Sequence, residues 1–270
     1  MADPLARVEL LARSLRDAAA GGATPRWLLL SRFGVEFLGA ALRSKRPTEV
    51  DRFGLLRLAT LRDVPLLVLD RDPAEAGDDA LEDALAVFAA GRAGLRGVVQ
   101  CIAGAAIEPA LATPSIALVR DWLRWGDEDP MRGLPAARLG ARYPDLRGWR
   151  DAAELALLAP PLASRGVRGA VAVARRGPSG ASAAEFEAMR RLGGELVVEA
   201  GAAEMVAALQ QGLRGVTLAL VLDAALKRPP DDPGLPAAAA DELLPKLAPL
   251  LGEILVRLEQ LEAGGAELGA

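Results

Sequence analysis

Residues 65–102 read PLLVLDRDPAEAGDDALEDALAVFAAGRAGLRGVVQCI, and this stretch indicates the class of fold. Its two ends, residues 65–70 and 97–102, are short apolar runs rich in Val, Leu and Ile, the pattern of strands buried on both faces of a sheet. Between them, residues 78–90 carry apolar side chains at helical spacing. A strand, a helix and a second strand in this order predict an α/β fold.

The same alternation continues outward in both directions. Further strands are predicted at residues 27–31, 115–119, 169–174, 195–198 and 216–222. Further helices are predicted at residues 149–164, 182–192 and 202–211, with an N-terminal helix at 1–22 and a C-terminal helix at 236–262. Loops are predicted at residues 126–148 and 228–236, which are rich in Pro and Gly, and a frayed tail at 263–270. We therefore expect one domain over residues 1–270, in which helices flank a mixed central β-sheet.

The composition excludes several classes of function. The chain has no histidine and one cysteine, Cys101, so histidine-dependent nucleophile systems and zinc sites made of cysteines are excluded, and we expect no cofactor. A net charge of -4 without a basic cluster argues against nucleic-acid binding. No apolar run reaches the roughly 18 residues of a membrane-spanning helix. The single cysteine and the charged N-terminal helix favour a cytoplasmic protein with no membrane partner.

An ordered series of local motifs is the most specific feature of the chain. The motifs are AGAAI at residues 103–107, DPMRG at 129–133, RYPD at 142–145, GPSGASAAE at 177–185, MRRLGGE at 189–195 and EMVAA at 204–208. In their order and spacing they resemble the motifs of the purine nucleoside phosphorylase and methylthioadenosine phosphorylase family of trimeric type. The resemblance covers residues 27–261 and identifies the chain as a divergent member.

The resemblance implies a site that holds phosphate and a purine nucleoside or base. The matching positions are Ser31, Arg71 and the backbone of Ala103 for phosphate, Ala181 and Asp223 for the base, and Glu75 and Glu199 for the ribose. Phosphate is the expected co-substrate if the chain is active. The resemblance also implies a homotrimer, in which a neighbouring subunit closes the ribose side of each site.

Several of these positions carry side chains unsuited to the chemistry of the family. Pro73 stands in place of the phosphate-site histidine, and Ala200 in place of a second serine. Ala181 cannot hydrogen-bond a base, although the family has a glutamate there. The two glutamates on the ribose side would repel phosphate. Arg32 replaces a glycine of the phosphate loop and could supply a substitute positive charge.

The same residues also have interpretations without any function. Arg71 lies between two aspartates and is typical of a surface ion-pair cluster. Ser31 is typical of a turn, and Cys101 of a small buried side chain. Glu199 and Asp223 could be solvated acids at strand ends.

Two hypotheses about function follow, and a third stays open. The first is a homologue with a degraded active site, which has lost catalysis and acts as a binding or structural subunit. The second is an active phosphorylase that uses Ser31, Arg71 and Arg32 for phosphate. It would prefer a 6-aminopurine, because an ionised Asp223 accepts a hydrogen bond from an amine and repels a 6-oxo group. The third is an unrelated monomeric α/β binding protein with a differently placed pocket.

Overall fold

The strands of the computed structural model build one mixed sheet. The model describes residues 3–20, 24–42, 47–50, 53–71, 79–126, 129–132, 139–149, 153–175, 181–225 and 237–267. Within these residues the strands are β1 (Trp27–Ser31), β2 (Thr48–Val50), β3 (Gly54–Leu61), β4 (Val64–Asp70), β5 (Gly97–Ala106), β6 (Ser115–Arg124), β7 (Arg168–Ala174), β8 (Leu196–Val198) and β9 (Arg214–Ala224). Their order in the sheet is β2-β3-β4-β1-β5-β8-β7-β6-β9, with a further pairing between β5 and β9.

This further pairing closes one half of the sheet into a ring. Strand β5 pairs with β9 and with β8, β9 pairs with β6, and β7 joins β6 to β8. The inside of the ring is packed largely with small or β-branched residues, among them Ala117, Ala172, Val198 and Ala219. The other half stays open and runs outward through the parallel strands β1 and β4 to the antiparallel β3 and β2. Small side chains suit the narrow interior of a ring of this size.

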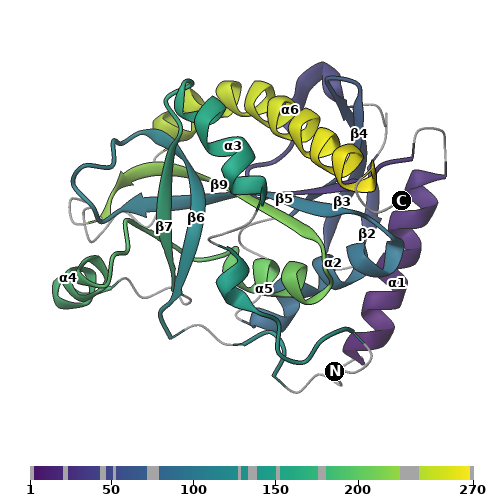
Figure 1. Ribbon diagram of the computed structural model, residues 1–270, viewed down its shortest axis with the longest axis horizontal. Coiled ribbons are helices and arrows are strands. Elements are labelled where there is room, and N and C mark those ends of the chain that lie inside the picture. Colours follow the sequence, from purple (N-terminus) through teal and green to yellow (C-terminus); the bar gives the residue numbers. More distant parts are fainter. Residues whose placement is uncertain are drawn as a thin grey trace.

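Helices cover both faces of the sheet (Figure 1). They are α1 (Pro4–Ala19), α2 (Ala80–Ala93), α3 (Ala153–Ala163), α4 (Ala183–Arg191), α5 (Ala202–Gln210) and α6 (Ala237–Glu267), with 3-10 turns η1 (Glu36–Ala41) and η4 (Leu146–Trp149). Helices α6 and α3 lie on one face, and α1, α2 and α5 on the other. The fold is thus a single α/β domain with a mixed sheet between helices, as the sequence predicted.

Strand β1 shows why the layers form as they do. Its side chains alternate, so Leu28 and Leu30 enter the core beneath α1 and α2, while Trp27 and Leu29 enter the core beneath α6. All four side chains are buried. Each fully buried large apolar side chain contributes about 1.5–3 kcal/mol to folding. A continuous apolar run is therefore required here, because neither face of β1 meets solvent.

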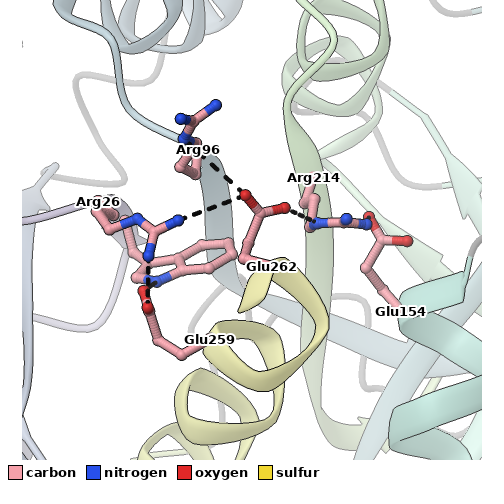
Figure 2. A network of polar contacts seen from close by, with 7 residues as sticks. Arg26, Arg96, Glu154, Arg214, Glu259 and Glu262 are labelled. Carbon is pink, nitrogen blue, oxygen red and sulfur yellow. Dashed lines mark hydrogen bonds and ion pairs between the residues drawn. The ribbon is translucent and has the colours of Figure 1, made fainter. Parts of the chain in front are cut away.

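An ion-pair network fixes the end of α6 to the amino-terminal edge of the sheet (Figure 2). Arg26 precedes β1 and lies 2.8 Å from Glu259 and 3.5 Å from Glu262. Arg96, just before β5, lies 3.9 Å from Glu262, and Arg214, the first residue of β9, also pairs with Glu262. Three neighbouring parallel strands thus each supply, at their amino-terminal ends, a cation to Glu262, and Arg26 also pairs with Glu259.

The structure corrects several predicted boundaries. Strands β2 and β3 were not predicted. Strand β2 is short, and β3 neither alternates regularly between apolar and polar residues nor forms a continuous apolar run like the buried strands. Helix α3 begins at Ala153, later than predicted. Helix α6 continues to Glu267, five residues beyond the predicted end at residue 262. The predicted loop at residues 228–236 lies outside the described residues. Among the helices that are described, none has both the length and the apolar character needed to cross a membrane.

Candidate functional site

The structure brings Ser31 and Arg71 together at the carboxyl-terminal edge of the sheet. Ser31 ends β1, and Arg71 directly follows β4. The two strands are parallel neighbours, and the backbone N–H of Arg71 donates to the carbonyl of Ser31 at 3.0 Å. In open α/β sheets, ligands bind outside this edge.

The other expected positions lie on strands of the same edge. Ala103 of β5 is opposite Leu220 of β9, and Ala105 of β5 is opposite Asp223 of β9. Glu199 follows β8, which is antiparallel to β5, so it is placed beside Ala103. Glu199 is exposed, whereas Asp223 is half-buried and lies inside β9 rather than after its end.

The remaining predicted positions say little about the geometry of the site. Ala181 is half-buried and packs with the apolar cluster of Ile107, Val173 and Met189. Its methyl group can make an apolar contact with a base but no hydrogen bond. Glu75 and Pro73 lie outside the described residues. The burial of Cys101 agrees with its interpretation as a small buried side chain.

The hydroxyl of Ser31 is used inside its own turn. Ser31 is fully buried, and its Oγ donates to the carbonyl of Gly34 at 2.6 Å while accepting from the N–H of Phe33 at 3.3 Å. Gly34 has a φ of 70°, a conformation that favours glycine. These contacts of Ser31 are those of a turn residue.

The charged centre of this edge is a buried quartet of Arg32, Arg71, Asp83 and Glu204. Arg32 Nη2 lies 3.0 Å from Asp83 Oδ1 and 3.0 Å from Glu204 Oε1, and Arg71 Nη1 lies 3.4 Å from Asp83 Oδ1. The side chains of Arg32, Arg71, Asp83 and Glu204 are 10%, 6%, 1% and 2% exposed. The interpretation of Arg71 as part of a surface cluster is therefore wrong, because its ion-pair partner is a buried carboxylate on α2.

The pKa values of the two arginines shift in opposite directions. Burial alone would lower the pKa of Arg32, but the charges of Glu204 and Asp83 outweigh it, and the pKa is raised. Burial, and then the positive charge of Arg32, lowers the pKa of Arg71. Two guanidinium groups this close together repel each other, so the carboxylates between them are needed to hold both in place.

Two helix starts hold the carboxylates of the quartet. Asp83 lies in the first turn of α2, and its backbone carbonyl also accepts from Arg71 Nη1 at 3.4 Å. Glu204 lies in the first turn of α5, where its Oε2 accepts from the N–H of Gly201 at 3.0 Å and its Oε1 accepts from Arg32. Glu204 is therefore both a helix cap and an ion-pair partner.

Neither Asp83 nor Glu204 was predicted to belong to the site. Glu204 appears in the sequence only as the first residue of the EMVAA motif. Asp83 carries a signal that could have been used, because it is the one buried charge among the apolar residues of α2. A carboxylate in such a run is almost never left without a cation.

One cavity lies elsewhere, between β6, β9, α3 and α5. Its volume is about 40 Å³, and its walls include Trp122, Trp149, Glu154, Met205 and Thr217. At roughly 10–15 Å³ for each water, it holds a few water molecules rather than a purine nucleoside. None of the expected site residues lines it. In the described part of the chain, no group of three potential metal ligands occurs.

Comparisons with known proteins agree with this architecture. No protein-family model matches the sequence, and no curated protein matches it. Crystal structures of Schistosoma mansoni purine nucleoside phosphorylase in complex with adenosine and with inosine are similar at a TM-score of 0.79 and 17% identity, over 93% of this chain and 96% of the other. A schistosoma purine nucleoside phosphorylase in complex with hypoxanthine gives a TM-score of 0.76 at 18% identity over the same shares. The chain therefore has a purine nucleoside phosphorylase-like fold.

Proposed function

We propose that this chain, which has the fold of purine nucleoside phosphorylases, does not catalyse phosphorolysis and acts as a binding or structural protein. One observation carries the proposal. The two side chains expected to hold phosphate are committed to internal partners, Ser31 to the carbonyl of Gly34 and Arg71 to Asp83. A phosphate ion would have to compete with both contacts.

The remaining positions support the same proposal. Cleavage of a nucleoside by phosphate requires a clamp for the anion, a grip on the ribose and a group that stabilises the departing base. Ala181 has no polar side-chain atom for the base. Glu199 adds an exposed negative charge directly after β8, the antiparallel neighbour of β5, and negative charge near this edge would repel phosphate. The side chains present can bind a ligand by shape but supply little stabilisation of a transition state.

A purine nucleoside or base is the ligand class that we propose for the carboxyl-terminal edge of the sheet. The similar structures contain adenosine, inosine and hypoxanthine. Asp223 would favour a 6-aminopurine among them, because a carboxylate accepts from an exocyclic amine. We propose no metal or other cofactor, no nucleic acid and no membrane partner, and a cytoplasmic location.

The first prediction is that no free base is released when the protein is incubated with phosphate and a panel of purine nucleosides. Chromatography of the products measures the release. The physical reason is that the expected phosphate contacts are already occupied. Release that rises with protein concentration and disappears in Arg71→Met would establish the alternative, an active phosphorylase. Equal release from 6-amino and 6-oxo nucleosides would then remove the proposed role of Asp223.

The second prediction concerns assembly. We expect light scattering to give the mass of three chains, because the resemblance to trimeric phosphorylases implies that a neighbouring subunit closes the ribose side. A monomer at all concentrations would contradict this prediction.

A further inference from the structure

We infer that the buried quartet is an oxyanion site filled by the protein's own carboxylates, and that it accepts a small external oxyanion once Asp83 is removed. This inference rests on the proposed function in one respect, the absence of bound phosphate at this edge of the native protein. The inference adds that the carboxylate of Asp83 is what keeps phosphate out.

The charges of the quartet balance. Two guanidinium groups from the ends of β1 and β4 face two carboxylates from the starts of α2 and α5, and all four are largely withdrawn from solvent. An additional anion entering this site would leave it with excess negative charge at low effective dielectric, which is strongly unfavourable. The native protein should therefore exclude phosphate and similar anions from the quartet.

Removal of Asp83 changes this balance and leaves the arginines in position. The backbone carbonyl of Asp83 accepts from Arg71, so this contact survives any substitution of the side chain. Arg32 keeps its pair with Glu204 at 3.0 Å. The site then carries excess positive charge in a buried place, and guanidinium groups bind oxyanions through charge-assisted hydrogen bonds. Formate matches the lost carboxylate in size, and phosphate is the larger candidate.

The experiment compares the native protein with Asp83→Ala and two control variants. Asp83→Asn removes the charge but leaves no room, and Glu82→Ala removes the neighbouring acid, which is more exposed and pairs with Arg7. Thermal unfolding and calorimetric titration are measured with formate, phosphate or chloride at equal ionic strength. For Asp83→Ala we expect a saturable rise in Tm and an apparent Kd for formate or phosphate at least about tenfold lower than in the native protein.

The other proteins should behave differently. The native protein and Glu82→Ala should show no saturable response to formate or phosphate relative to chloride. Asp83→Asn should respond less than Asp83→Ala. If Asp83→Ala does not fold in chloride, its refolding yield in formate is measured instead, and recovery in formate supports the inference.

Two results would overturn the inference. One is saturable phosphate binding by the native protein that is lost in Arg71→Met, because the site would then not be filled. The other is an Asp83→Ala variant without any response to, or recovery by, formate or phosphate. The first result would also remove the observation that carries the proposed function, whereas the second leaves it untouched. Release of free base by the native protein tests the proposed function separately.

Discussion

Replacement of Arg32 by methionine is expected to lower the free energy of unfolding by about 3–5 kcal/mol. Arg32 is the only residue of the quartet that contacts both carboxylates, at 3.0 Å each. Methionine retains much of the apolar stem but removes the ion pairs that Arg32 makes with Glu204 and with Asp83, while Arg71 stays 3.4 Å from Asp83. A buried charge without a partner costs far more than the loss of a surface ion pair. Urea denaturation at neutral pH measures the change.

Two controls separate this cost from a general effect of losing an arginine. Arg191→Met breaks an exposed pair with Glu187 on α4 and should leave stability unchanged within error. Arg32→Met combined with Glu204→Gln should recover part of the loss, because one uncompensated charge disappears. A loss below about 1 kcal/mol would show that the quartet is not a buried ion-pair cluster.

The strands of the core were predictable because both of their faces are buried. A strand such as β1, whose five residues are all buried, must be apolar throughout, and such a run stands out in a sequence. Strand β3 was not found because its burial is uneven along its length. The closure of β5 to β9 into a ring depends on pairings between segments more than a hundred residues apart, such as Val99 with Val216, which local patterns do not specify.

Motifs name positions for the site, but they do not give its contacts. The resemblance names Ser31 and Arg71, and the parallel pairing of β1 with β4 makes them neighbours. It did not reveal that Arg71 has an internal partner, because Asp83 lies on α2 and meets Arg71 only after α2 packs on the sheet. Motif matching finds the positions of a site, whereas charge compensation depends on the three-dimensional packing.

Replacement of Trp27 by alanine is expected to lower the free energy of unfolding by about 3–5 kcal/mol. Trp27 is fully buried at the start of β1, in the core beneath α6, and its Nε1 donates to Glu259 Oε1 at 2.6 Å. Its indole ring lies so close to Gly97 of β5 that a Cβ there would come within 2.4 Å of the ring. The ring thus fills a space that the sheet leaves for it, and alanine would leave a cavity.

The matched variant Trp27→Phe separates packing from the hydrogen bond. Phenylalanine keeps most of the apolar ring but removes the N–H, and Glu259 retains Arg26 at 2.8 Å, so we expect a smaller loss of about 1–2 kcal/mol. Both variants are compared with the native protein by urea denaturation. Because the same residue joins β1 to the end of α6, Trp27→Ala should also speed hydrogen exchange in the last turns of that helix. A loss in Trp27→Ala no larger than in Trp27→Phe would show that the indole is not packed in the core and that the hydrogen bond alone fixes this end of α6.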